Sequence, residues 1–164
     1  MDKPKKSLPD WPQQPPVDEN DTHHHIVPDF YAGAVEEASG DPSGWAIPEW
    51  SLDSSRHTIQ KLGVQTSILS ITAPGACILH GKASHELARK LNLEDARICD
   101  QEPEKFGFFA NPPDLLETQA ALDELQYALN VLKADRVTLF TRYCLGKLIS
   151  WTPQCPAYLG GVTL

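Results

Sequence analysis

The chain of 164 residues has few cysteines, and no two of them lie at a paired spacing. The four, Cys77, Cys99, Cys144 and Cys155, form no Cys-x-x-Cys pair and no zinc-finger pattern, which excludes those two kinds of thiolate site. No run of residues approaches the roughly 20 apolar positions of a membrane-spanning helix. Residues 1–16 also lack the apolar segment of a secretory signal. We therefore expect reduced thiols, no membrane partner and a cytoplasmic protein.

Positive charge is scarce as well. The chain has 14 Lys and Arg residues against 22 Asp and Glu residues, which gives a net charge of -8 and a pI near 5.1. Because such a surface repels phosphate backbones, we expect no nucleic-acid partner. The length is sufficient for one domain with a hydrophobic core. We divide the chain into a flexible Pro-rich tail over residues 1–19, a folded part over 20–143 and a divergent tail over 144–164.

Strand-like and helical patterns alternate through the folded part. Strands are predicted at about 18–26, 64–71, 106–110 and 136–140, and helices at 51–62, which Gly63 ends, and at about 84–102. Asp114 and Glu117 have the spacing of a capping box before a last helix. The core stripe of that helix is Leu122, Leu125, Leu129 and Leu132. This alternation predicts an α/β fold with a parallel sheet, either an open doubly wound sheet or the first half of a (β/α)8 barrel.

Three consecutive histidines end the first predicted strand. Successive side chains of a strand point to opposite faces, so His23 and His25 share one face and His24 takes the other. Two imidazoles on one face can bind a divalent metal such as Zn, Mn, Fe or Ni. The alternative interpretation is a solvated polar turn that contains three histidines and binds no metal. No Gly-rich turn follows the strand, which disfavours a dinucleotide site. Barrel enzymes place their chemistry at strand ends, so the barrel half is favoured.

Two further features are candidates for substrate binding. The loop over residues 40–50 contains Trp45 and Trp50, which either line a pocket for a flat ring or pack over the barrel mouth. Arg142 follows the fourth predicted strand and is either a charged fork for a substrate carboxylate or, as we favour, an ordinary exposed arginine. The remaining histidines, His57, His80 and His85, are interpreted as surface or structural residues.

Several motifs in order resemble one enzyme family. His-x-His at positions 23 and 25 resembles the amidohydrolase superfamily. The runs His-His-His-Ile-Val-Pro, Gly-Asp-Pro-Ser-Gly-Trp, Pro-Glu-Trp-Ser, Ser-Ile-Thr-Ala-Pro-Gly and Lys-Phe-Gly-Phe-Phe-Ala narrow it to the amidohydrolase-related decarboxylases. The resemblance covers residues 20–143. It implies a TIM-like barrel, one divalent metal (zinc first, manganese as the alternative), no organic cofactor and loss of CO₂ from a small aromatic or unsaturated acid. It also makes His23 and His25 the first two metal ligands.

The end of the chain departs from the family pattern. Residues 141–164 contain no His, Asp or Glu. In the family that the chain resembles, the remaining metal ligands and the catalytic acid and base residues come from later strands. A full barrel needs about 250 residues. We therefore expect a chain truncated after about four strands, with its catalytic residues beyond its end and with little or no turnover. Two alternatives remain open: a metal-dependent amide or lactone hydrolase, and a non-catalytic half-barrel that binds a partner chain or a second copy.

Overall fold

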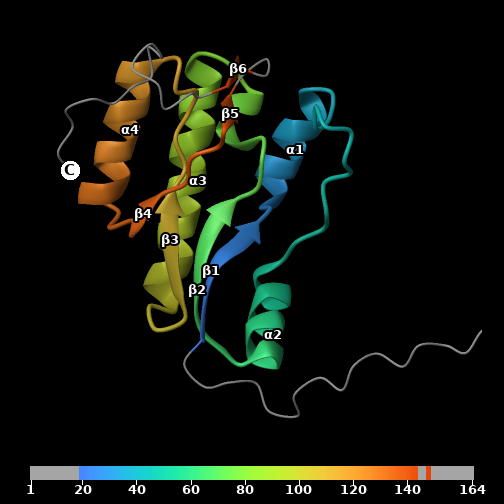
Figure 1. The fold of residues 1–164 in the computed structure, drawn as a ribbon, viewed down its shortest axis with the longest axis vertical. Coiled ribbons are helices and arrows are strands. Elements are labelled where there is room, and N and C mark those ends of the chain that lie inside the picture. The colour runs from blue at the N-terminus through green and yellow to red at the C-terminus, as the bar shows by residue number, and fades with distance from the viewer. Residues whose placement is uncertain (1–18, 144–146, 149–164) are drawn as a thin grey trace, which may run out of the picture.

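Four parallel strands form the sheet of the computed structural model, which describes residues 19–143 and 147–148. They are β1 (Glu19–Ile26), β2 (Val64–Ile71), β3 (Phe106–Ala110) and β4 (Arg136–Val137), and they lie in the order β1-β2-β3-β4 (Figure 1). Strands adjacent in sequence are therefore adjacent in the sheet, as in a (β/α)8 barrel. The predicted α/β class is confirmed, while most of the two predicted tails lies outside the described residues.

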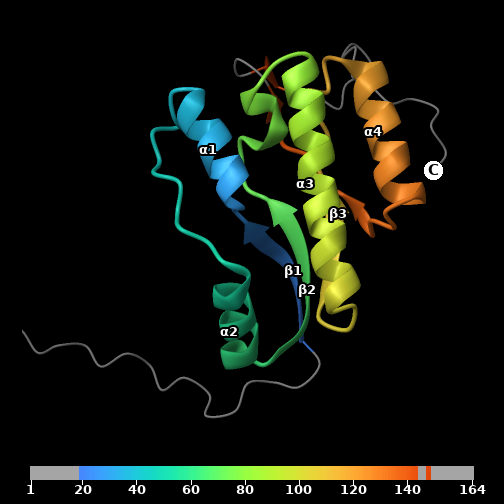
Figure 2. The same ribbon diagram turned by 180° about the vertical axis from the view of Figure 1, so that it is seen from behind.

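The helices alternate with these strands. They are α1 (Asp29–Glu37), α2 (Leu52–Leu62), α3 (Lys82–Gln101) and α4 (Thr118–Asn130), together with the 3₁₀ helix η1 (Gly75–Ile78). Figure 1 shows the sheet in front of α3, and Figure 2, from behind, shows α3 in front of the sheet. After β4 the chain forms a short antiparallel pair, β5 (Arg142–Tyr143) with β6 (Lys147–Leu148). The sheet thus has one face covered by α3.

The second helix begins and ends where its residues predict. The Ser51 hydroxyl accepts a hydrogen bond from the Ser54 N–H at 3.1 Å, which caps the first turn. Gly63 follows the last turn with φ 71°, a left-handed conformation that glycine adopts without a Cβ clash. Both signals are local, which is why the sequence alone located this helix.

One helix was missed in the sequence, and two predictions about the elements are wrong. Helix α1 was not predicted, because its sequence has no clear helical repeat of apolar residues. It contains Gly33 and two glutamates, and only Tyr31 and Val35 are buried. Asp114 does not form a capping box, since α4 begins later, after Glu117, and has no side-chain cap. The fourth strand is limited to Arg136–Val137, whereas the sequence predicted a strand over residues 136–140. It is shorter because its partner β3 ends at Ala110, which pairs with Val137.

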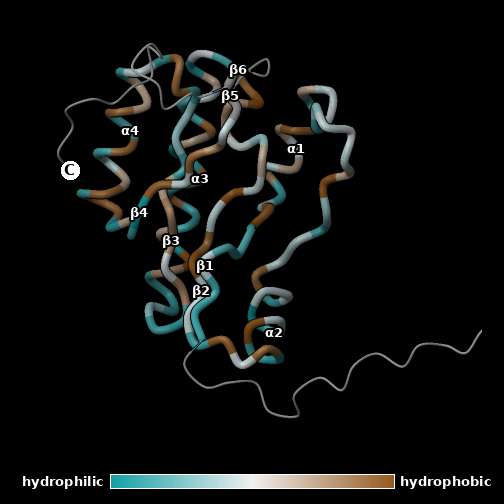
Figure 3. Tube along the Cα trace, viewed as in Figure 1, coloured by the Kyte–Doolittle hydropathy of each residue, from teal (hydrophilic) through white to brown (hydrophobic). Residues whose placement is uncertain are grey.

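The core lies between the sheet and α3. Phe106, Phe108 and Ala110 alternate inward from β3 and meet Leu91 and Ile98 of α3, all of them buried. Figure 3 shows hydrophobic and hydrophilic residues alternating around α3 and α4, as amphipathic helices require. Of the predicted leucine stripe, Leu125 is buried, Leu129 and Leu132 pack against the core half-buried, and Leu122 is half-buried outside it.

Candidate functional site

The histidine motif occupies the last residues of β1, at the carboxyl end of the strand. His23 and His25 are exposed on the sheet face opposite the core, whereas Ile26 is fully buried. The two rings meet edge to face, with 4.4 Å between their centroids and 73° between their planes. Ser70 of β2 lies beside them, with its Oγ 3.4 Å from His25 Nδ1. The structure therefore brings together the two predicted metal ligands.

The environment of His25 favours its neutral form. Partial burial of the ring, followed by the charge of the neighbouring His23, lowers the pKa of His25, and a hydrogen bond with the backbone of Ser70 only partly offsets this lowering. An imidazole binds a metal through an unprotonated nitrogen, so a neutral ring is the competent form. The pair has the chemistry of a divalent metal site.

His24 points the other way, as the alternation of the strand predicts. Its Nδ1 is 3.0 Å from Asp21 Oδ2, and its Nε2 is 2.9 Å from the Oγ of Ser55 in α2. Trp50 donates its indole N–H to the same Ser55 oxygen at 2.9 Å. The middle histidine is therefore hydrogen-bonded on the side of the sheet away from His23 and His25.

A pocket of about 410 Å³ opens beside the histidine pair. Its wall combines the two imidazoles with the rings of Phe109 and Phe140 and the hydroxyls of Ser70, Thr72 and Thr138. Thr138 Oγ1 is buried without a hydrogen-bond partner among the described residues. A cavity of this size with apolar walls and a few polar groups is typical of a small-molecule site.

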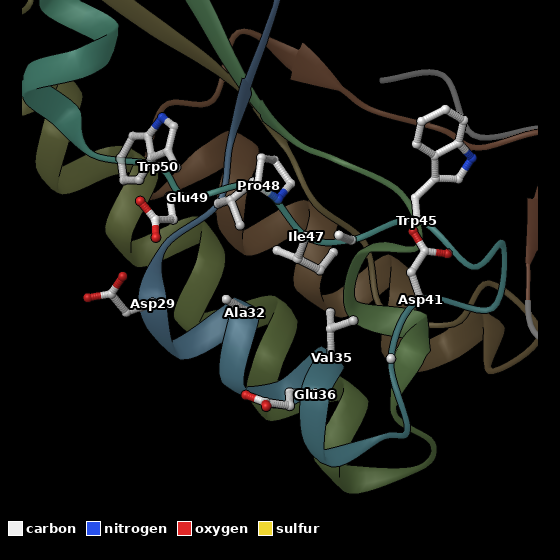
Figure 4. Close-up of a pocket in the computed structure, with 13 residues that line it drawn as sticks. Asp29, Ala32, Val35, Glu36, Asp41, Trp45, Ile47, Pro48, Glu49 and Trp50 are labelled. Carbon is white, nitrogen blue, oxygen red and sulfur yellow. The ribbon is translucent and has the colours of Figure 1, made fainter.

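The two tryptophans line a different and larger cavity, of about 700 Å³, between α1 and the loop. Figure 4 shows Trp45 and Trp50 far apart along the loop over residues 40–50, with Ile47 between them over α1. Trp45 is 78% exposed, whereas Trp50 packs against the core. The cavity is lined by Asp29, Glu36, Asp41 and Glu49 and by no Lys or Arg. Four carboxylates repel an acidic substrate. The histidine pocket is therefore the better candidate for the binding site of a carboxylic acid, despite its smaller volume.

None of the other candidate histidines lines the histidine pocket. Arg142 belongs to β5 through its backbone pairing with Leu148, and its side chain is outside the described part of the structure. His57 and His80 are exposed, and His85 Nε2 lies 3.0 Å from Glu117 Oε2. Among the described side chains, no group of three or more His, Cys, Asp or Glu could hold a metal. His23 and His25 are thus a pair without a third described protein ligand.

The thiols show no sign of a reactive site. Burial, followed by the charges of nearby carboxylates, raises the pKa of Cys99 to about 12, and the buried Cys77 donates its S–H to the Pro74 carbonyl at 2.9 Å. A thiol with a raised pKa is a poor nucleophile. Cys144 and Cys155 lie outside the described residues.

One supporting residue was missed in the sequence. Tyr31 of α1 is buried, and its hydroxyl donates to the Thr72 carbonyl at 3.0 Å and accepts the Gly75 N–H at 3.0 Å. The two bonds hold the loop that follows β2, and this loop contributes Thr72 and Ala73 to the histidine pocket. Burial raises the pKa of Tyr31, so the hydroxyl stays protonated and keeps its donor. The only sequence signal was an aromatic residue shortly after the histidines.

Known proteins match this chain over part of their length. The 6-methylsalicylic acid decarboxylase of Aspergillus aculeatus is 49% identical over 127 residues, which are 77% of this chain and 38% of that protein. This chain therefore spans well under half the length of such relatives. No protein family model matches it. Among the described helices, none is long and apolar enough to cross a membrane.

Solved structures show the same architecture. An amidohydrolase II is 25% identical with a TM-score of 0.77, over 86% of this chain and 45% of that one. A 2,6-dihydroxybenzoate decarboxylase, solved with 2,6-dihydroxybenzoate, is 25% identical with a TM-score of 0.58, over 88% and 44%. A dihydroxybenzoic acid decarboxylase from Polaromonas, solved with bound manganese and an inhibitor, shares the fold at 21% identity, with a TM-score of 0.55 over 74% and 37%. The sheet and helices correspond to the first half of an amidohydrolase-type barrel.

Proposed function

We propose that this chain, which is homologous to part of the amidohydrolase-related decarboxylases, is the N-terminal part of a decarboxylase that acts on a small aromatic carboxylic acid. Its first strand, β1, would supply two of the metal ligands. The observation that carries the proposal is the pair of His23 and His25, 4.4 Å apart between ring centroids, at the carboxyl end of the first strand. The homology to a 6-methylsalicylic acid decarboxylase supports an aromatic acid as substrate.

The pocket suits such a reaction. Phe109 and Phe140 offer apolar surface to a flat ring, and His23 and His25 would hold a divalent ion, zinc or manganese, beside it. A bound ion would stabilise negative charge on the oxygens of the substrate. In the reaction, the bond between the ring carbon and the carboxyl carbon breaks, CO₂ leaves, and a proton takes its place on the ring. No organic cofactor is required by this balance.

Metal binding by purified, metal-stripped chain tests the first part of the proposal. Zn²⁺ and Mn²⁺ are titrated calorimetrically into the wild type, His23→Ala, His25→Ala and, as the matched control, His57→Ala, which changes an exposed histidine of α2. We expect both substitutions in the pair to weaken binding at least about tenfold, equivalent to about 1.4 kcal/mol, and the control to leave it unchanged. Equal affinity in all four proteins would contradict the proposal.

Turnover tests the second part. The metal-loaded chain is incubated with 6-methylsalicylate, and CO₂ release is followed in the wild type and in His23→Ala. Release that depends on His23 supports decarboxylation by this chain. Cleavage of an aryl ester or lactone, with no CO₂ from the acid, would identify the hydrolytic alternative. Metal binding without either reaction would restrict the role of this chain to metal binding.

The open sheet supports a second candidate function, binding of another chain. Within the described part of the structure, β1 and β4 are the outer strands and each pairs on one side only. An unpaired strand edge is a template for pairing with another chain. Sedimentation measures this directly: a concentration-dependent dimer would support a second copy as the partner, and a monomer across the concentration range, with a single cooperative melt, would argue against it.

A further inference from the structure

The spacing of Asp21 and His24 is incompatible with a regular strand. Residues three apart in a strand point to opposite faces, yet Asp21 Oδ2 lies 3.0 Å from His24 Nδ1. The pairing with β2 explains the contact. Between the Asp21–Ser67 and His24–Leu69 pairs, β1 advances by three residues and β2 by two, so β1 carries one extra residue. This β-bulge brings Asp21 to the face of His24.

Asp21 also holds the backbone of the bulge. Its Oδ1 accepts the N–H of His23 at 3.0 Å, while Oδ2 serves His24. One carboxylate thus ties the backbone of the first proposed metal ligand to the ring of the residue that follows it. His23 therefore lies within the bulged segment, before the regular pairing with β2 resumes at His24.

The hydrogen bonds of His24 admit one neutral tautomer. An ionised carboxylate only accepts, so His24 Nδ1 must carry the proton that faces Asp21. An indole N–H only donates, so the Ser55 oxygen accepts from Trp50 and is left to donate its own proton to His24 Nε2. All members of the chain Trp50–Ser55–His24–Asp21 are then satisfied in a single direction.

The same order of groups occurs in hydrolytic triads, but Ser55 is not placed to act as a nucleophile. Its side chain belongs to a residue only 3% exposed, and its oxygen already accepts the Trp50 N–H. Attack on a substrate needs an accessible oxygen. The arrangement is therefore better explained by orientation of the strand than by covalent catalysis.

We propose that Trp50, Ser55, His24 and Asp21 form a positioning relay that fixes the bulge of β1 and, through it, the geometry of the His23–His25 pair. The metal role of that pair rests on the proposed function, whereas the relay itself does not. The relay joins the loop over residues 40–50 to β1 on the side of the sheet away from His23 and His25. Trp50 is then a positioning residue, and a change in its indole alters a pair of histidines that it does not contact.

The test begins with the wild type and needs no variant. Nitrogen-15 NMR of the histidine rings at about pH 8, where ordinary imidazoles are neutral, reports which nitrogen of His24 carries the proton. We expect the Nδ1–H form. A His24 ring protonated on Nε2, or exchanging between both forms, would overturn the relay.

Two variants and a matched control follow. Trp50→Phe removes the indole N–H and keeps an aromatic ring, Ser55→Ala removes the shared hydroxyl, and Trp45→Phe changes the exposed tryptophan of the same loop. In metal-free protein, we expect ring shifts of His23 and His25 to change in the first two variants and not in the control. We expect the first two variants to bind Zn²⁺ about tenfold more weakly, the order found for residues that orient metal ligands, and the control to bind like the wild type.

The outcomes separate the two proposals. Urea unfolding identifies any variant that no longer folds, and in that case the tautomer in the wild type remains decisive. Unchanged His23 and His25 shifts in folded Trp50→Phe would overturn the relay even if metal binds. Changed shifts with no metal binding in the wild type would support the relay and contradict the metal role of the pair.

Discussion

The side-chain amide of Asn92 binds both backbone groups of Asn111. Asn92 Oδ1 accepts the Asn111 N–H at 2.7 Å, and Asn92 Nδ2 donates to the Asn111 carbonyl at 3.1 Å. Asn111 directly follows β3, so a residue of α3 supplies the two hydrogen bonds that a neighbouring strand would otherwise provide. The Asn111 side chain in turn accepts the N–H of Ile71 at the end of β2 at 3.2 Å. The ends of two strands next to the histidine pocket are thus anchored to one helix.

We expect Asn92→Ala to destabilise the protein by about 3 kcal/mol, since it removes the partner of both buried backbone groups of Asn111 and of Glu124 Oε1, while Glu124 Oε2 keeps its contact with Arg89. Asn130→Ala, at the exposed end of α4, is the control and is expected to change stability by less than about 0.5 kcal/mol. Urea unfolding gives both values from the transition midpoints at constant slope. Similar midpoints for Asn92→Ala and the control would show that the paired amide is not a structural anchor.

The carboxyl of Asp95 makes the stability depend on pH. This side chain is fully buried, and its Oδ2 accepts from Asn111 Nδ2 at 2.8 Å, while Oδ1 has no partner among the described residues. Burial, only partly offset by that hydrogen bond, raises the pKa of Asp95 well above its ordinary value. The folded protein therefore keeps a proton that the unfolded chain has already released. The free energy of unfolding falls as pH rises through this interval.

Asp95→Asn mimics the neutral carboxyl and removes this dependence. We expect the variant to be more stable than the wild type at about pH 7 and about equally stable near pH 3.5, where carboxyls are largely protonated in both states. Asp100→Asn, an exposed position of α3, is the control. Thermal melts across this pH range measure the effect, and a constant difference between Asp95→Asn and the wild type at all pH values would refute it.

Two glycines in different conformations should respond oppositely to alanine. Gly63 ends α2 with φ 71°, so Gly63→Ala places a Cβ in the left-handed region and is expected to cost about 1 kcal/mol. Gly33 lies within α1, and an added Cβ meets no atom within 4 Å. Gly33→Ala should therefore stabilise the protein by about 0.5–1 kcal/mol. Differential scanning calorimetry compares the two, and a shift of the same sign in both would contradict the assignment.

Gly107 lies where two side chains approach the backbone closely. A Cβ there would collide with Asp135 Oδ2 and come within 2.9 Å of Ile68 Cδ1. The same Asp135 oxygen accepts the Phe108 N–H at 3.0 Å. We expect Gly107→Ala to displace this exposed carboxylate and to destabilise the protein by about 1 kcal/mol, the contribution of the hydrogen bond that is lost. Hydrogen exchange at the Phe108 amide measures the change directly, and unchanged protection would show that the carboxylate is not displaced.

The elements that the sequence predicted well have local causes. Strands β2 and β3 have the predicted bounds for local reasons. β3 is a short apolar run that Asn111 and Pro112 end, and β2 is a run rich in β-branched residues between Gly63 and the Ala73-Pro74-Gly75 segment. Helix α2 has its cap residues at both ends. Helix α1 was missed because its stability depends on two buried residues, Tyr31 and Val35, and on their packing partners elsewhere in the chain. Helices with a weak local pattern are stabilised mainly by tertiary packing.

The sequence by itself determined the α/β class and the side-by-side placement of His23 and His25, because these follow from the periodicity of hydrophobic residues and from the alternation of a strand. Periodicity left an open doubly wound sheet and a half barrel as alternatives, and the strand order β1-β2-β3-β4 of the structure decided between them. Only the tertiary structure decided that Asp21 turns to the side of His24, that Trp50 joins the same hydrogen-bond chain through Ser55, and that the tryptophan cavity is separate from the histidine pocket. Asp21 reaches His24 only because a β-bulge separates them, and the contact of His24 with Ser55 joins residues 31 positions apart. The spacing of residues along the chain carries no information about either feature.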